Sequence, residues 1–520
     1  MVIDLLGKAV RRHIISSGIM INNLISERRT KMRNFKFLIV ALLLVTALAI
    51  GTACSTDDPV VTETIQATAT PTPQEGATPA ETPTPATPEP ATTGGFTYRF
   101  DEFIQANWWA NWDTATANPQ TQMDEDRLWD RVELEEEFGF TGRAINVGGW
   151  DTARDMIPME IMGGSRDIHL WHVGPDWFAG LNRQGMFAPL DIAWFNDDYG
   201  TNWHMSTIEA SMVNGVPFAF NQGPINGGGI YFNQRLFEEA GLDPELPFDL
   251  QLRGEWTWDV FRDLAQQLTR DLTGNGVPDV FGVTTFAQDF MSRSLTSNGI
   301  NAVGFDTSTQ RFTNITNTPD FIQAFNWAQS IFEDGSVQPQ PEGGEWNFFI
   351  DAFNSGQAAM RSGGDYLAGG QIHPNLDDPW GFVSFPMGPR ANTHLFNGNH
   401  NFITVANTFN REEAEEIVHM FNLWYRALDG WDPAMGWVSG AHAVHSNPRS
   451  VNETMMLFAR NSDHMSPCFR AMAGIPEGNP GFGSTFAWSM WQDGTDVAAV
   501  IEAGQLVWND MLARANGDID

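Results

Sequence analysis

A segment that cannot fold divides this chain. Residues 55–95 are dominated by Thr, Pro, Ala and Glu, as in the run ETPTPATPEP at positions 81–90. Such a segment buries too little apolar surface to offset its conformational entropy, and Pro-rich chain stays extended at about 3.1 Å per residue. We therefore expect residues 54–95 to form a tether that reaches on the order of 100 Å, and the compact part to be 96–520.

The tether follows a candidate export signal. Basic residues precede the apolar run 37–50, small residues follow it, and then comes Cys54. This order is typical of a secretory signal peptide, and the cysteine looks like a bacterial lipoprotein box with Gly51 in place of the usual leucine. A transmembrane anchor is the alternative, but the run is shorter than the roughly 20 residues that span a bilayer. We predict a signal peptide at 1–53, with Met32 as the candidate true start, lipidation of Cys54, and an anchored location on the extracellular face of the cell membrane.

Charge and cysteine content exclude some partners and some sources of stability. The formal net charge is −35 at pH 7, so nucleic acid and anionic lipid surfaces are not expected partners. Cys468 is the one cysteine after Cys54, so no disulfide can form within the folded part. About 425 residues are ample for two domains whose stability comes from burial.

Strand-like and helix-like stretches alternate along the folded part, which favours an α/β fold. Apolar periodicity and capping residues locate several elements, including a capping-box-like start in which Glu413 follows the N-cap by three positions. The pattern predicts strands at 100–109, 143–147 and 166–171, and helices that end at Gly139, begin at Thr318 and begin at Asn410.

The aromatic content is high, with 20 Trp and 37 Phe but 5 Tyr. Most of these rings are expected to pack in the core. Several Trp, however, stand at expected strand ends beside Asp or Asn. That mixture suits sugars, because an indole can cover the apolar C–H face of a sugar ring while carboxylates and amides hydrogen-bond its hydroxyls. The candidates on this ground are Trp108, Trp112, Trp150, Asp151, Asp176 and Trp177.

One segment resembles a calcium loop. The residues at its ligand positions are Asp271, Thr273, Asn275, Val277 (through its carbonyl) and Asp279. Position 12 is Gly282 rather than the usual bidentate Glu. A plain Asn-Gly turn explains the same residues. The sequence therefore leaves two alternatives, a structural calcium ion in this loop or no cofactor at all.

No catalytic signature stands out. The sequence has no phosphate loop, no Gly-x-Ser-x-Gly elbow and no His-Glu-x-x-His motif. His442 and His445 lack Cys or carboxylate partners nearby in sequence, so zinc is not expected. We therefore expect no enzyme. The alternatives are a wall-attached carbohydrate adhesin and an extracellular polysaccharide-degrading enzyme. Such an enzyme would need paired carboxylates, such as Asp151 and Asp176, roughly 5–9.5 Å apart.

Four segments resemble the extracellular solute-binding proteins of family 1, the sugar-binding components of ATP-binding-cassette importers. The segment FNSGQAAM is the most specific of the four, and the resemblance extends over 96–520. The segments are GVPF at 215–218 with GIYFNQRLFEEAGL at 229–242, TWDVFRDLAQQL at 257–268, FNSGQAAM at 353–360 and WGFVSFPMGP at 380–389.

This resemblance implies a two-lobed, maltose-binding-protein-like fold. The chain would cross between the lobes more than once, and a hinge would close them over the ligand. The implied lobes are 96–218 with 393–440, and 219–392 with 441–520. The resemblance also implies a monomer that binds a sugar such as an oligosaccharide without catalysis and delivers it to importer permease subunits.

The resemblance also extends the candidate site. Asp176 falls where the family's Asp binds sugar hydroxyls, and Trp177 replaces the neighbouring Arg, which exchanges a hydrogen-bonding fork for a stacking face. Tyr366 falls where a stacking Trp is expected, with Asp365 beside it. The further candidates from position along the resemblance are Asn221, Asp289, Asn399, Trp488 and Trp491.

Overall fold

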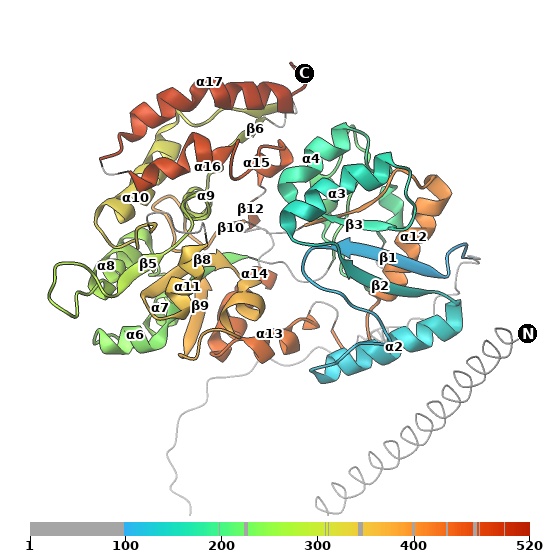
Figure 1. Ribbon diagram of the computed structural model, residues 1–520, viewed down its shortest axis with the longest axis horizontal. Helices are drawn as coiled ribbons and strands as arrows, with labels where there is room; N and C mark the ends of the chain where they lie inside the picture. Colours follow the sequence, from blue (N-terminus) through green and yellow to red (C-terminus); the bar gives the residue numbers. More distant parts are fainter. Residues whose placement is uncertain are drawn as a thin grey trace, which may run out of the picture. The chain divides into compact units, whose positions relative to one another are not determined.

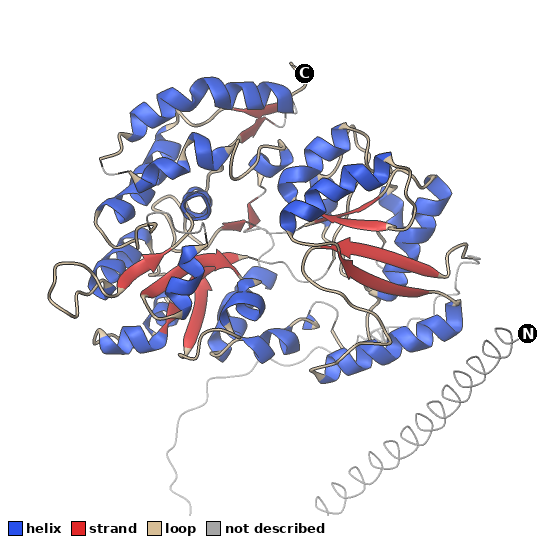
Figure 2. Ribbon diagram, in the orientation of Figure 1, coloured by secondary structure: helices blue, strands red, loops and turns tan. Residues whose placement is uncertain are grey.

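The structure is a computed structural model in which helices flank two main β-sheets (Figure 2). The α/β class predicted from the sequence is therefore confirmed. The residues that the structure describes are 98–196, 198–222, 227–306, 308–309, 311–341, 347–397, 401–432, 435–460, 465–466, 468–492 and 494–519.

The first sheet has the strand order β11-β3-β1-β2. Strand β1 runs parallel to β2 and β3, whereas β11 runs antiparallel to β3. The third strand begins later than the sequence predicts, because Arg166 binds Glu413 and the Thr408 carbonyl at the surface instead of joining the sheet. Its four strands are β1 (Glu102–Asn107), β2 (Thr141–Asn146), β3 (Leu170–Val173) and β11 (Phe402–Val405).

The second sheet has the order β5-β8-β4-β9. Strand β4 runs antiparallel to both β8 and β9, and β5 runs parallel to β8. Strands β4, β8 and β9 are buried along their whole length, as expected for a sheet covered on both faces. These strands are β4 (Gly228–Asn233), β5 (Phe281–Thr284), β8 (Ala358–Gly364) and β9 (Trp380–Ser384), and two small ladders join β6 (Gly304–Asp306) to β7 (Arg311–Thr313) and β10 (Phe396–Asn397) to β12 (Met465–Ser466).

Three helices form where the sequence places their ends. Helix α2 (Gln122–Phe138) stops at Gly139, whose φ of 74° is left-handed and favours glycine. Helix α10 (Pro319–Glu333) is capped by the Thr318 hydroxyl. Helix α12 (Arg411–Trp424) begins at Asn410 in a capping box with Glu413. The predicted helix ends are therefore confirmed.

The other helices connect the strands and cover the sheets (Figure 1). They are α3 (Trp150–Met162), α4 (Pro175–Arg183), α5 (Met205–Ala210), α6 (Gln234–Glu239), α7 (Leu246–Leu252), α8 (Trp258–Leu268), α9 (Ala287–Ser297), α11 (Phe348–Asn354), α13 (Val438–Val444), α14 (Met456–Arg460), α15 (Phe469–Met472), α16 (Phe482–Thr485) and α17 (Val497–Ala515), with short helical turns η1 (Ile192–Trp194), η2 (Ala368–Ile372), η4 (Ser450–Met455) and η6 (Ala487–Trp491).

Each sheet has its own hydrophobic core. One cluster surrounds the first sheet and includes Trp171 and Trp424. Two clusters cover the second sheet, and the larger one reaches from β4 to Trp508 in α17. The chain thus passes from the first sheet to the second, returns for β11, and leaves again for the second core, which confirms the two-lobed fold with several crossings. The boundaries 218/219, 392/393 and 440/441 stay predictions.

In the part of the chain that the structure describes, no helix combines the length and apolar character that spanning a membrane requires.

Candidate functional site

Three tryptophans meet at the ends of the first sheet's parallel strands. Trp108 follows β1, Trp150 opens α3 and Trp177 lies in the first turn of α4, directly after β3. The ring centroid of Trp150 lies 4.2 Å from that of Trp177 and 4.8 Å from that of Trp108. The carboxyl ends of parallel strands share one edge of the sheet, where α/β proteins usually bind ligands.

The exposure of these indoles differs. Trp150 is 40 % exposed, Trp108 is half-buried, and Trp177 is 8 % exposed and belongs to the core cluster. The Trp150 ring lies on the backbone of Gly174, where a Cβ would come 2.5 Å from the ring, so this packing requires glycine. Trp150 therefore offers the largest accessible face of the three.

Two other candidates on the first lobe make no contact with these three rings in the hydrogen bonds, ion pairs and ring contacts of the described residues. Trp112 packs edge-on against Trp424, and the guanidinium of Arg131 lies 4.2 Å from its ring centroid. Asp151 is exposed and forms an ion pair with Arg154. The arrangement gives Trp112 a packing role and gives Asp151 a solvated surface position.

Asp176 links the first lobe to the C-terminal part of the chain. Its carboxylate lies 3.4 Å from Nη1 of Arg470. Arg470 is the second residue of α15, and its side chain is 7 % exposed. Its other oxygen accepts the backbone N–H of Glu477 at 3.1 Å. Because Arg470 also donates to the Ile475 carbonyl, the carboxylate is held in a defined orientation. The sequence indicated Asp176 but missed Arg470, whose partner is 294 positions away.

A second polar cluster lies beside the second sheet. Asp289, in the first turn of α9, makes two hydrogen bonds with Arg293 at 2.7 and 2.8 Å and accepts the Ser362 hydroxyl at 2.8 Å. The guanidinium fills the space above Gly228, where a Cβ would lie 1.0 Å from Nη1. Asp289 is thus already paired. Although the Tyr366 side chain is 59 % exposed, desolvation and then the Asp289 charge raise the pKa of its phenol.

The two C-terminal tryptophans differ. Trp488 is 37 % exposed, and its Nε1 donates to Gln288 beside Asp289 at 2.8 Å, which places it next to the second cluster. Trp491 instead packs against Phe332 at a centroid distance of 4.8 Å.

Two candidates, Asn221 and Asn399, were predicted from their position near the crossovers between the lobes. Asn221 is half-buried and donates to the Asn401 carbonyl. Asn399 and Cys54 lie outside the described residues.

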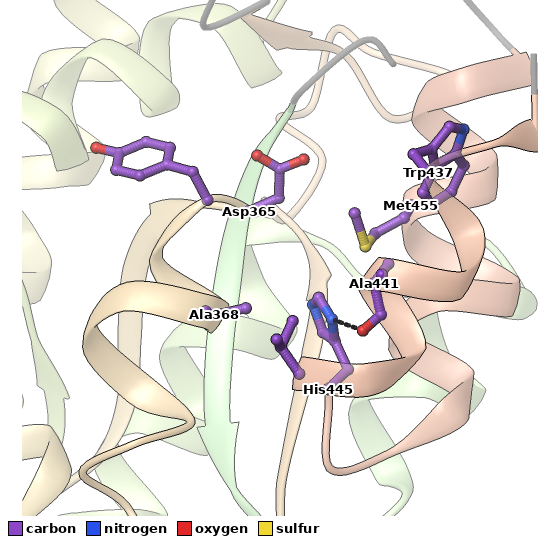
Figure 3. A pocket seen from close by; sticks show the side chains of 10 residues that line it. Asp365, Ala368, Trp437, Ala441, His445 and Met455 are labelled. Carbon is purple, nitrogen blue, oxygen red and sulfur yellow. Dashed lines mark hydrogen bonds between the residues drawn. The ribbon is translucent and has the colours of Figure 1, made fainter. Parts of the chain in front are cut away.

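A cavity of about 240 Å³ lies between η2, α13 and η4, next to the end of β8 (Figure 3). Asp365 lines it on one side, and Trp437, His445 and Met455 line it on the other (Figure 3). Tyr366 also contributes to the lining. Asp365 is 5 % exposed, and burial raises the pKa of its carboxyl to about 7. The sequence indicated Asp365 and Tyr366, but it missed Trp437 and assigned no binding role to His445.

The loop at 271–279 is closed by its own backbone. The Asp271 carboxylate accepts the N–H groups of Gly274 and Gly276 at 2.7 Å, and these bonds lower its pKa. Asp279 accepts two further N–H groups of the loop. The carboxylates are therefore satisfied without an ion. The described residues contain no group of three or more His, Cys, Asp or Glu that could hold a metal.

Comparisons with known proteins agree with this architecture. The family described as bacterial extracellular solute-binding protein matches residues 136–422. No curated protein matches the chain.

Several solved structures share the fold. A cyclic alpha-maltosyl-1,6-maltose binding protein from Arthrobacter globiformis has a TM-score of 0.56 at 14 % identity, covering 79 % of this chain and 99 % of that one. UgpB from Mycobacterium tuberculosis, solved with glycerophosphocholine, has a TM-score of 0.55 at 15 % identity, covering 80 % and 98 %. The GacH receptor of Streptomyces glaucescens has a TM-score of 0.52 at 14 % identity, covering 79 % and 98 %. At such identities the likeness shows the fold. The family match spans more than half of the chain, and the chain therefore belongs to the bacterial extracellular solute-binding proteins.

Proposed function

We propose that this solute-binding protein captures a carbohydrate between its lobes and delivers it to a membrane importer. The observation that carries the proposal is the cluster of Trp108, Trp150 and Trp177 at one edge of the first sheet, with Trp150 the most exposed of the three and Asp176 next to Trp177 in the sequence. Indole faces and an oriented carboxylate are the two groups that a sugar ring needs, for its C–H face and its hydroxyls. Several fold relatives are described with sugar ligands, among them cycloalternan and maltotriose.

The second lobe supplies complementary groups to the same proposal. Tyr366 and Trp488 each present a partly exposed ring near Asp289. Aromatic faces from both lobes would let one ligand bridge them, so that binding favours the closed arrangement. Asp176 and Asp289 each form an ion pair with an arginine, which would fix the orientation of the carboxylate for hydrogen bonds with sugar hydroxyls.

The proposal extends to the location of the protein. Lipidation of Cys54 would anchor the chain to the extracellular face of the membrane, and residues 55–95 would act as the tether. The folded part would work as a monomer that presents its ligand to permease subunits and leaves the sugar chemically unchanged.

The direct test is calorimetric titration of the purified protein with a panel of oligosaccharides. We expect binding to at least one of them, and we expect Trp150→Ala to weaken it by about 2 kcal/mol or more, as buried aromatic anchors do. Trp194→Ala is the matched control, because Trp194 is a partly exposed tryptophan that packs beneath Arg411 elsewhere on the lobe. No binding across the panel, or equal effects of the two substitutions, would overturn the proposal.

An assay for reducing ends separates binding from hydrolysis. We expect the bound oligosaccharide to be recovered intact after prolonged incubation. Release of new reducing ends that Asp176→Asn abolishes would instead establish a polysaccharide-degrading enzyme.

A further inference from the structure

A second cavity, of about 260 Å³, lies beside helix α2. Its volume is below the roughly 300–1,000 Å³ of pockets that hold drug-sized ligands, so it has room for a small molecule. The residues that line it come from the loop before α2, between positions 112 and 119, and from α2 itself, between positions 124 and 131. The cavity therefore belongs to the first lobe, and Trp108, Trp150 and Trp177 do not line it.

One wall of this cavity carries a buried cation without an anionic partner. Arg131 is 8 % exposed, and no ion pair or hydrogen bond joins its guanidinium to a carboxylate in the described part of the chain. Asp130, the residue before it, pairs with Arg127 and Arg426 instead. Burial lowers the pKa of Arg131 to about 10, which leaves the side chain charged at neutral pH.

Aromatic rings surround the Arg131 guanidinium and leave its terminal N–H groups available. Its central carbon lies 4.2 Å from the ring centroid of Trp112, 4.8 Å from that of Trp424 and 5.3 Å from that of Tyr425. The Tyr425 hydroxyl also favours the charged form, but a neutral group does not balance the charge. Nε is buried without a partner among the described residues, whereas Nη1 and Nη2 are not buried and can donate into the cavity that Arg131 lines.

The other charged groups around the cavity do not supply the missing anion. Arg127 lines it as well and shares the Asp130 carboxylate with Arg426. Asp124 also lines it but is exposed, and its Oδ2 already accepts two backbone N–H groups at the start of α2. Three guanidinium groups and two carboxylates thus lie in this region, so its local charge is positive although the chain has a formal net charge of −35.

The walls indicate which kind of anion fits. A guanidinium can donate two parallel hydrogen bonds to a carboxylate or to a tetrahedral oxoanion. Trp112, Pro119 and Leu128 make much of the remaining wall apolar. A phosphate or sulfate would place its other oxygens against these groups, and burying polar atoms without hydrogen bonds is unfavourable. An organic carboxylate can instead turn an apolar body towards them.

We propose that this cavity binds a small organic carboxylate, with its carboxylate group on Arg131 and its apolar body against Leu128 and Pro119. The site is separate from the carbohydrate site and does not depend on the proposed function. Its occupation would stabilise the protein, because a ligand that binds the native state alone raises the apparent stability.

The test compares benzoate with benzamide, which has nearly the same shape and no charge. Binding to the purified protein at pH 7 is measured by ligand-observed NMR and by thermal shift. We expect benzoate to bind at least about 10-fold more tightly than benzamide, as suits a charge-assisted hydrogen bond to a buried guanidinium. Phosphate and sulfate should bind less tightly than benzoate.

Three variants locate the site. Arg131→Met removes the charge but keeps an unbranched apolar side chain among the rings, and it should abolish the preference for benzoate. Leu128→Glu retains Arg131 and adds a carboxylate three positions earlier on the same helix, where it can pair with the guanidinium. It should abolish benzoate binding, and it tests the site even if Arg131→Met fails to fold. Arg411→Met is the matched control, because Arg411 also lies over a tryptophan ring but is paired with Asp191.

Equal binding of benzoate and benzamide would overturn the proposal. So would a preference for benzoate that survives in either folded cavity variant, or one that Arg411→Met weakens as much as Arg131→Met does. Tighter binding of phosphate or sulfate than of benzoate would also overturn it, because the cavity would then be an inorganic anion site. The oligosaccharide titrations are scored separately, so the proposed function and this inference can fail independently.

Discussion

Replacing Asp365 by Asn should stabilise the protein, and increasingly so as the pH rises. The Asp365 side chain is 5 % exposed, and burial raises the pKa of its carboxyl to about 7. The folded state therefore prefers the protonated acid. Asparagine has nearly the same shape and stays neutral at every pH, so it removes the cost of ionising a buried carboxyl.

The magnitude follows from proton linkage. With an unfolded pKa of about 3.9 and a folded pKa of about 7, ionisation of Asp365 costs about 1.5 kcal/mol at pH 5 and about 4 kcal/mol at pH 8. The cost vanishes below the unfolded pKa, grows up to the folded pKa and is constant above it. The advantage of Asp365→Asn should thus grow by up to about 2.5 kcal/mol between pH 5 and pH 8.

Urea unfolding followed by tryptophan fluorescence at both pH values measures this difference. Effects of the substitution that do not depend on pH cancel between the two conditions, as do groups that titrate alike in both proteins. Asp377→Asn should show no such growth, because that carboxylate is exposed. An advantage of Asp365→Asn that is flat with pH, or that falls as the pH rises, would refute a strained buried acid at this position.

Further expectations concern the aromatic faces, the anchor and the loop. Trp177→Ala should lower the free energy of unfolding by about 3–5 kcal/mol, because the indole is core-packed, whereas Tyr366→Ala should weaken ligand binding with little change in melting temperature. Calorimetric titration beside thermal melts separates the two effects. Cys54→Ser should move the protein from the membrane fraction into the medium, and retention of the variant in membranes would count against lipidation. A chelator should leave the melting temperature unchanged, because backbone N–H groups already satisfy Asp271; a drop in melting temperature that Asp271→Ala abolishes would establish a calcium site.

The site was only partly predictable. Trp108, Trp150 and Trp177 are separated in sequence, but each follows a parallel strand, so a shared edge could be inferred from the strand pattern. The sequence could not show which faces of these rings are open, because exposure depends on close approaches in the fold, such as that of Trp150 to Gly174. Trp112 has the same local sequence character, yet the Arg131 guanidinium covers its ring.

Local signals in the chain were sufficient for several helix ends and for the fold class, although the start of β3 was predicted too early. Caps at Thr318 and Asn410 and a left-handed Gly139 act within a few residues, so helix ends can be inferred from short stretches. Alternating patterns then favour an α/β fold. The composition of residues 55–95 predicts a tether, because the amount of apolar side chain available for burial can be read from the sequence alone. These properties depend on residues that are close together in the sequence, so the sequence alone specifies them.

Tertiary packing was needed for everything that depends on distant partners. The ion pair between Asp176 and Arg470 joins residues 294 positions apart, and the cavity joins Asp365 to His445 from different elements. Burial and hydrogen bonding set the charge state and orientation of such groups, and both are properties of the folded surroundings. A carboxylate looks the same in sequence whether it is solvated, paired or buried without a partner, and the packing around it makes the difference.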